Sequence, residues 1–201
     1  MILKSWDGSD NGTYIFKGEC DMEFLEGGLP PIPDYLLKEA EKLNYILDND
    51  NGDFLDKLSH VYDYIDKFNE YLGNYAACTK GCSHCCKIDV QISQAEAELI
   101  HIKTKVPIDL KNSISYGYTT PCPFLSDENN CKIYKYRPLP CRMLHAFGSP
   151  DNCKPGNVQN EYGSPASNFG NHIFLSLVQY IHMNNKAFGG TFRDIRDYFH
   201  R

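Results

Sequence analysis

The chain has 201 residues, of which 42% are hydrophobic, so it can bury a core and is not typical of a disordered protein. Its formal net charge of −6 argues against a nucleic-acid groove, because a surface that binds phosphates is basic. No apolar run reaches about 18 residues, so we expect no membrane span, and the first residues lack the pattern of a signal peptide. These features predict a globular protein of the reducing cytoplasm that contacts neither membrane nor nucleic acid.

Residues 1–74 are expected to form an irregular segment followed by a helical hairpin. Glycines and prolines break helices throughout residues 1–31. Apolar residues then recur at helical spacing from about Pro33 to Leu47, and again over residues 53–73. A cluster of Asp, Asn and Gly between these two stretches predicts a turn, so the two helices should run antiparallel.

The most informative stretch is 78–86, which reads CTKGCSHCC and holds four cysteines in nine residues. Four more cysteines follow singly: Cys122, Cys131, Cys141 and Cys153. The total of nine is odd, which disfavours a framework built only of disulfides, and in a reducing compartment such density indicates metal or redox chemistry. Structural disulfides and redox thiols are the weaker alternatives. Cys20 stands apart and is interpreted as a small buried hydrophobic residue.

After the cysteine-rich stretch, Ser93 and Glu96 have the spacing of a capping box, which predicts a helix to about Lys103. Residues 107–170 hold most of the prolines and should be rich in loops, which metal coordination would fix in place. Helical spacing returns at about 168–186, and a short last helix is expected after a cap within 191–194. The predicted fold is therefore mainly α: a small helical domain with a loop-rich, cysteine-ligated metal centre.

We expect residues 75–201 to be a cysteine-cluster metal-binding domain with C-terminal helices, forming one compact unit with residues 1–74. Its metal is iron or zinc. A structural zinc site usually has two C-x2-C knuckles, whereas here Cys82 and Cys85 alone show that spacing. The single downstream cysteines slightly favour an iron–sulfur centre, whose ligands tolerate varied spacing. Two zinc sites of four sulfurs each stay open as an alternative.

The spacing Cys78-x3-Cys82-x2-Cys85 also matches the signature of radical S-adenosylmethionine enzymes. That signature belongs after the first strand of a large α/β barrel, whereas here helices are expected on both sides. The spacing match is therefore weak evidence for that class of enzyme.

The full pattern resembles the YkgJ-like cysteine-cluster proteins, often described as zinc- or iron-chelating domains. It consists of C-x3-C-x2-C-C at 78–86, Pro121–Leu125, Cys131–Tyr134 and Arg137–Arg142. The resemblance covers roughly residues 75–155, or 75–199 if the terminal stretch Asp194-Ile195-Arg196 is counted. Two departures are the first gap, which is one residue longer than the family shorthand, and Met143–His145, where relatives often have Tyr-Pro. The resemblance implies eight metal ligands: Cys78, Cys82, Cys85, Cys86, Cys122, Cys131, Cys141 and Cys153.

The same resemblance implies candidate activities, because the family includes flagellin lysine N-methylases, which look like iron–sulfur enzymes that use S-adenosylmethionine. The first hypothesis is a metal-binding protein, with iron–sulfur ahead of zinc, that acts in modifying a protein or peptide. One alternative is a lysine N-methylase-like enzyme with S-adenosylmethionine as cofactor, and the other is a zinc-stabilised interaction module. No catalytic acid, base or nucleophile stands out.

Four charged or titratable residues near the cysteines have open roles. His84 and His145 could be ligands or proton donors, although hydrogen bonding to backbone is the favoured interpretation. Arg137 and Arg142 could hold a carboxylate or phosphate, or could equally bond loop carbonyls.

Overall fold

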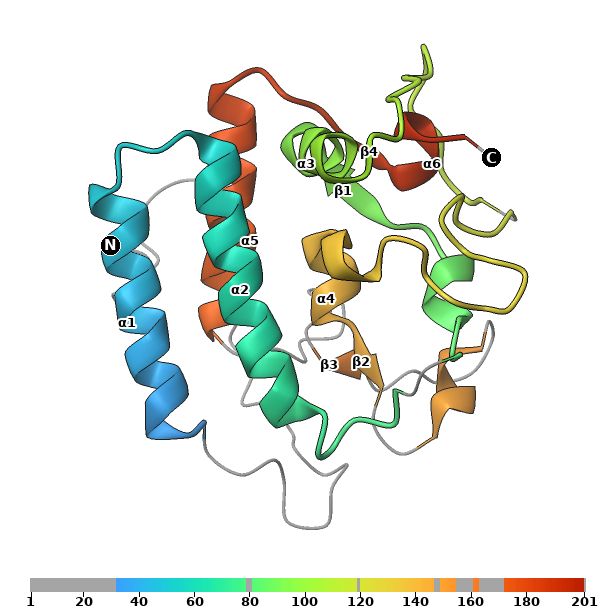
Figure 1. Ribbon diagram of the computed structural model, residues 1–201. Coiled ribbons are helices and arrows are strands. Elements are labelled where there is room, and N and C mark those ends of the chain that lie inside the picture. Colours follow the sequence, from blue (N-terminus) through green and yellow to red (C-terminus); the bar gives the residue numbers. More distant parts are fainter. Residues whose placement is uncertain are drawn as a thin grey trace, which may run out of the picture.

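The computed structural model describes residues 32–78, 81–118, 120–146, 149–154, 161–162 and 172–200 (Figure 1). The predicted irregular segment 1–31, including Cys20, lies outside these residues. The fold is mainly α, as predicted. The helices are α1 (Asp34–Asn49), α2 (Phe54–Leu72), α3 (Gln94–Thr104), α4 (Leu139–Met143), α5 (His172–Ala187) and α6 (Ile195–Tyr198). Short 3₁₀ helices and strands join them: η1 (His84–Lys87), β1 (Gln91–Ser93), η2 (Tyr134–Tyr136), β2 (His145–Ala146), η3 (Pro150–Cys153), β3 (Glu161–Tyr162) and β4 (Phe192–Asp194).

The predicted helical hairpin is confirmed as α1 and α2, which lie side by side with α5 behind them (Figure 1). α2 begins after Asp53, whose side chain accepts a hydrogen bond from Asp56 N at 2.9 Å and so caps the helix. On α1 the predicted apolar stripe is buried at Leu36, Ala40, Leu43 and Leu47, whereas Ile46 is partly exposed and Leu37, which is turned away from the buried face, is 39% exposed.

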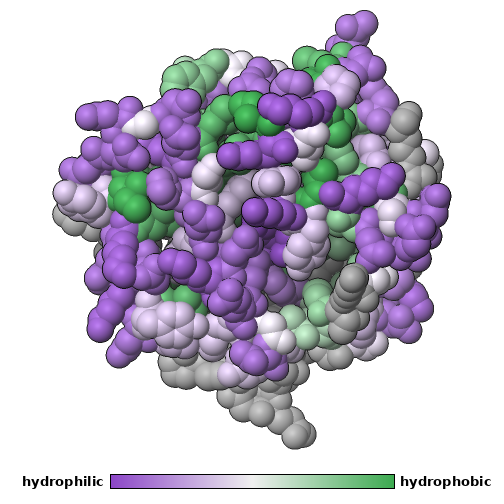
Figure 2. Space-filling model, in the orientation of Figure 1, coloured by the Kyte–Doolittle hydropathy of each residue, from purple (hydrophilic) through white to green (hydrophobic). Residues whose placement is uncertain are grey.

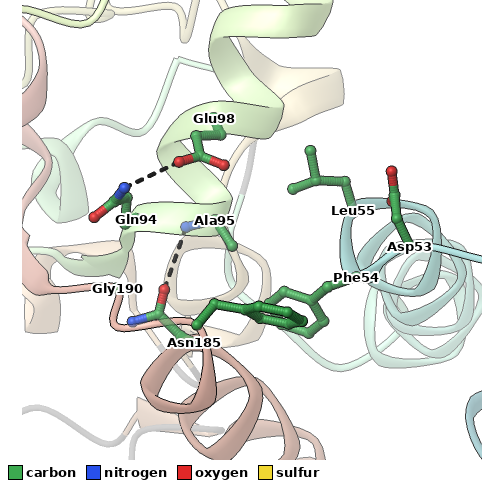
Figure 3. Close-up of a pocket in the computed structure, with 9 residues that line it drawn as sticks. Asp53, Phe54, Leu55, Gln94, Ala95, Glu98, Asn185 and Gly190 are labelled. Carbon is green, nitrogen blue, oxygen red and sulfur yellow. Dashed lines mark hydrogen bonds between the residues drawn. The ribbon is translucent and has the colours of Figure 1, made fainter.

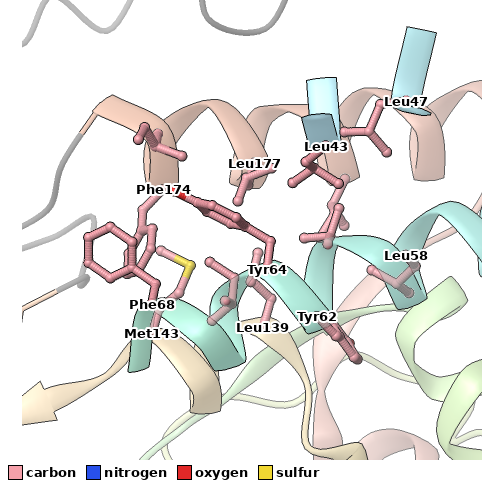
Figure 4. Packing of buried hydrophobic residues seen from close by; sticks show 14 of the residues in the cluster. Leu43, Leu47, Leu58, Tyr62, Tyr64, Phe68, Leu139, Met143, Phe174 and Leu177 are labelled. Carbon is pink, nitrogen blue, oxygen red and sulfur yellow. The ribbon is translucent and has the colours of Figure 1, made fainter. Parts of the chain in front are cut away.

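The larger core lies between these three helices and continues under α4 (Figure 4). Phe68 of α2 packs edge to face on Phe174 of α5, with ring centroids 4.8 Å apart. Leu139 and Met143 place the short helix α4 against the same cluster. Metal-domain residues and hairpin residues therefore share one continuous hydrophobic core.

A two-stranded sheet pairs β1 with β4 in antiparallel register, with Ile92 opposite Arg193. Residues 192–194 also form a strand before α6 begins, which the sequence did not predict. The cap is Asp194, whose side chain accepts from Arg196 N at 2.9 Å. A three-residue strand with a distant partner leaves no periodic signal in the sequence.

A second hydrophobic cluster lies beneath this sheet and reaches the cysteines. Its buried members come from β1, α3, the loop around 122–133 and the C-terminal segment: Val90, Ile92, Ala97, Ile100, Cys122, Phe124, Ile133, Ile195, Tyr198 and Phe199. The C-terminal residues therefore pack against the loop that carries Cys122 and Cys131.

The outer face over α2 is mostly hydrophilic, with small separate apolar patches (Figure 2). Exposed carboxylates such as Asp63 lie on the solvent side of α2. In the part of the chain that the structure describes, no helix is both long and apolar enough to cross a membrane.

Candidate metal centre

All eight cysteines of the predicted ligand set are described, and all eight are free thiols. They come from five places in the fold. Cys78 follows α2, the next three lie in and just before η1, Cys122 and Cys131 lie on one loop, Cys141 is in α4, and Cys153 ends η3. The alternative of structural disulfides among these eight therefore finds no support in the structure.

The first ligand segment turns sharply before η1. Gly81 has φ 90°, a left-handed conformation that favours glycine, so the chain can turn at this position just before Cys82. Cys86 N then donates to Ser83 O at 3.0 Å. The tight turn explains how cysteines so close in sequence can present their sulfurs to one region.

Cys122 and Cys131 are brought together by a small loop between them. Leu125 and Cys131 form an isolated antiparallel bridge, and Lys132 N donates to Phe124 O at 2.8 Å. Cys122 N donates to Cys86 O at 2.7 Å, which joins this loop to η1. Main-chain hydrogen bonds thus align two ligand segments that are well separated in sequence.

Cys141 is positioned by α4, which is anchored at its start by a buried carboxylate. Leu139 N donates to Glu96 Oε1 at 2.7 Å, and Tyr62 OH donates to the same oxygen at 3.1 Å. Ser93 and Glu96 also form the predicted capping box of α3, so one carboxylate links α2, α3 and α4. Glu96 is buried, and apart from the capping box nothing in the sequence indicates that it also anchors α4.

Arg142 completes the anchoring of α4, and its role is structural. Its side chain is 2% exposed, pairs with Asp66 of α2, and donates from Nε to Arg137 O at 2.7 Å. The guanidinium also lies over the Tyr62 ring, with Cζ 4.3 Å from the centroid. Of the two roles considered for Arg142, bonding to loop carbonyls is confirmed.

Seven of the eight thiols form one electrostatically connected group, with Cys85 at its centre. Burial raises the pKa of three of them, and a charge on Cys85 raises each further: Cys78, Cys131 and Cys141. The pKa of Cys86 is raised first by a hydrogen bond with Cys85 and then by burial. Without a cation these thiols are therefore neutral at pH 7, and a bound metal would displace their protons.

Cys122 and Cys82 extend the same group at its two ends. Burial raises the pKa of Cys122 to about 11, and the charges of Cys131 and Asp194 add to the rise. Cys82 contributes to the raised pKa of Cys78. Cys153 is buried at the end of η3, which packs against η1, so the eighth thiol lies on the same side of the molecule.

The donor chemistry fits a soft metal, because thiolates prefer zinc, copper(I) and iron–sulfur centres. Among the described residues, however, no three His, Cys, Asp or Glu side chains are arranged to hold a single ion. Among the described residues, the thiols therefore do not converge on one point.

Residues 77–164 match the family model described as "CxxCxxCC: putative zinc- or iron-chelating domain". This segment of the chain is therefore similar to that cysteine-cluster family. All eight predicted ligands lie within the matched CxxCxxCC domain, and so does the anchor Arg142. Neither the curated proteins nor the solved structures gave a match to the chain.

Six of the eight cysteine residues in the CxxCxxCC domain are partly exposed to solvent. Cys78 is exposed, Cys122 and Cys153 are buried, and the other five are intermediate. Most of these cysteine residues therefore lie at or near the surface of the described structure.

Arg137 and His145 lie beside the thiols of the domain. Burial raises the pKa of Cys78, Cys131 and Cys141, and the charge of Arg137 offsets part of that rise, so Arg137 lies near three ligand segments. Its guanidinium lies over the Tyr134 ring at 4.1 Å, and its buried Nε has no hydrogen-bond partner among the described residues. Burial lowers the pKa of His145 to about 4, and its Nδ1 lies 3.1 Å from Met143 O, as the backbone-bonded interpretation expects.

A pocket of about 310 Å³ lies apart from the CxxCxxCC thiols, and no cysteine lines it (Figure 3). It opens between the starts of α2 and α3 and the end of α5, with Phe54 and Glu98 on its walls. Asn185 closes one side and accepts from Ala95 N at 3.4 Å.

Proposed function

We propose that the eight cysteines bind metal as an iron–sulfur centre, with zinc as the alternative, and that the centre acts in modifying a protein or peptide. The observation that carries the proposal is the connected group of free thiols centred on Cys85, within a segment that matches a chelating domain. The residues that would hold the metal are the eight named above, in one or two centres.

The spread of the thiols supports iron–sulfur over zinc. Four sulfurs bound tetrahedrally to zinc at about 2.3 Å lie only about 3.8 Å from one another. No three candidate ligands among the described residues form such a convergent group. A cluster of several irons needs its cysteine sulfurs spaced more widely than a single zinc ion does, so ligands that do not converge on one point are compatible with it.

The accessible thiols support a centre that meets a substrate. Six of the eight cysteine residues retain some exposed surface, so a substrate could approach them from solvent. A protein or peptide side chain could approach Cys78, the most exposed of them. S-adenosylmethionine is a candidate cofactor in this proposal, and it would supply a methyl group if the activity resembles lysine methylation.

The alternative is a zinc-stabilised interaction module, in which the metal only fixes the loops between β1 and α5. Under that alternative every metal position is filled by cysteine, and removing the metal unfolds the loop-rich half. The iron–sulfur proposal instead expects an open coordination position.

Anaerobic purification followed by visible absorption and metal analysis tests the proposal. We expect a brown protein with iron and sulfide, and we expect Cys85→Ser to lose most of both. Cys20→Ser is the matched control, since it removes a thiol outside the proposed ligand set. A colourless protein with stoichiometric zinc would exclude the iron–sulfur assignment, and a protein that binds neither metal would exclude the metal centre altogether.

A further inference from the structure

The C-terminal segment carries a buried ion pair that reaches the cysteine loops, although it lies beyond residue 164, where the family match ends. Arg196 is 4% exposed and Asp194 is fully buried. Arg196 Nη1 lies 2.9 Å from Asp194 Oδ1 and 3.1 Å from Oδ2. A buried pair of this kind is stable only where its remaining donors and acceptors are also satisfied.

The remaining donors of Arg196 are satisfied by carbonyls of the cysteine-bearing segments. Nη2 donates to Cys86 O at 3.2 Å and to Ile88 O at 3.1 Å, and Nε donates to Thr120 O at 2.9 Å. Thr120 lies two residues before Cys122, whose own N–H donates to Cys86 O at 2.7 Å. One planar guanidinium therefore connects the chain at Cys86 to the chain just before Cys122.

Asp194 fixes the guanidinium from the other side. Its Oδ2 accepts from Val90 N at 2.6 Å, and its Oδ1 accepts from Arg196 N at 2.9 Å. Ile195 N donates back to Val90 O at 3.0 Å, so the end of η1, β1 and the start of α6 form one hydrogen-bonded unit. Neither side chain has freedom to turn away from the cysteine loops.

We propose that Arg196 is a positioning residue of the metal centre, which sets the separation of Cys86 and Cys122, and that Asp194 orients it. This inference rests on the proposed metal-binding function. Arg196 acts through main-chain carbonyls, so its loss would not remove a ligand but would let two ligand segments move apart. Loss of such an outer partner typically lowers metal affinity about 10- to 100-fold.

The full chain allows a test with a closely matched control. Arg193, on strand β4, also donates to a loop carbonyl, Lys111 O at 2.8 Å, but among the described residues it donates to none in a cysteine-bearing segment. We would titrate metal-free wild type, Arg196→Gln, Arg196→Lys and Arg193→Gln with Co²⁺ against a competing chelator. The thiolate-to-cobalt absorption band reports affinity and ligand geometry, and urea unfolding of the metal-free proteins reports stability separately.

We expect Arg196→Gln to bind Co²⁺ at least 10-fold more weakly with an altered band, and Arg193→Gln to bind within twofold of wild type. Arg196→Lys keeps the positive charge but loses the planar guanidinium with its several donors, so its affinity for Co²⁺ should be intermediate. If Arg196→Gln does not fold, Arg196→Lys provides the test. Wild-type affinity and spectrum in both Arg196 variants would overturn the inference, and so would an equal loss in Arg193→Gln. Failure of wild type itself to bind Co²⁺, zinc or iron would instead refute the proposed function.

Discussion

Replacing Tyr62 by phenylalanine removes one buried hydroxyl and leaves the ring that packs under Arg142. Tyr62 is 5% exposed, and its hydroxyl donates to Glu96 Oε1 at 3.1 Å. Burial and then the nearby Glu96 charge raise the pKa of Tyr62, so the hydroxyl stays protonated and can donate at neutral pH. The substitution therefore tests the carboxylate that links α2, α3 and α4 without creating a cavity.

The expected magnitude follows from the other donors of Glu96. A hydrogen bond to a charged group contributes about 1.5–3 kcal/mol to stability. Glu96 keeps Leu139 N at 2.7 Å and both Ser93 N and Ser93 Oγ at 2.9 Å, so its charge remains solvated by the protein. We therefore expect the lower part of the range, about 1.5–2 kcal/mol, which lowers Tm by about 3–8 °C in a chain of this size.

Urea unfolding of the metal-free proteins measures the loss, and Tyr45→Phe is the control because Tyr45 is 69% exposed. The control should stay within about 0.5 kcal/mol of wild type. If Tyr62→Phe is equally neutral, Glu96 does not depend on the hydroxyl and the anchoring of Cys141 through α4 must be explained otherwise.

Three further outcomes follow. Because burial and neighbouring thiols raise the pKa of the cysteines, metal affinity should rise steadily from pH 6 to pH 8 in a competition titration; a flat profile would contradict the raised values. The pKa of His145 falls from 6.5 to about 4 on folding, so the unfolded chain binds more protons between these values. Stability should then decline by up to about 3 kcal/mol as pH falls through this window, and His145→Asn should flatten that decline in acid unfolding curves. Deleting the ring of Phe174, which is fully buried, should cost about 3–5 kcal/mol in urea unfolding of Phe174→Ala, whereas Phe188→Ala, 76% exposed, should cost little.

The helices were predictable where one face stays apolar over several turns. On α2, Leu58, Ile65 and Leu72 recur at helical spacing and are all fully buried. The capping box at Ser93 and Glu96 likewise marked the start of α3, because its two hydrogen bonds are local. Both signals are contained within a few neighbouring residues, which is why the sequence alone was sufficient.

The candidate ligands were also visible in the sequence, but the groups that position them were not. Arg137 and Arg142 look equivalent in the sequence, five residues apart and close to Cys141. The structure gives them different surroundings. Arg142 pairs with Asp66 on α2, which is far away in sequence, whereas the buried Nε of Arg137 has no hydrogen-bond partner among the described residues. Partners this remote in sequence leave no local pattern.

The C-terminal segment shows the same limit more sharply. Periodicity assigned Ile195 and Tyr198 to a short apolar helix, and both are buried as that pattern implies. Nothing in the pattern indicated that Arg196, between them, would be 4% exposed and bonded to carbonyls about a hundred positions earlier in the chain. Burial of an arginine costs free energy unless several acceptors bond to its donors, so the carbonyls around Arg196 are needed for its burial. The carbonyls it binds adjoin Cys86 and Cys122, and this makes a segment outside the matched domain part of the physical argument for the metal centre.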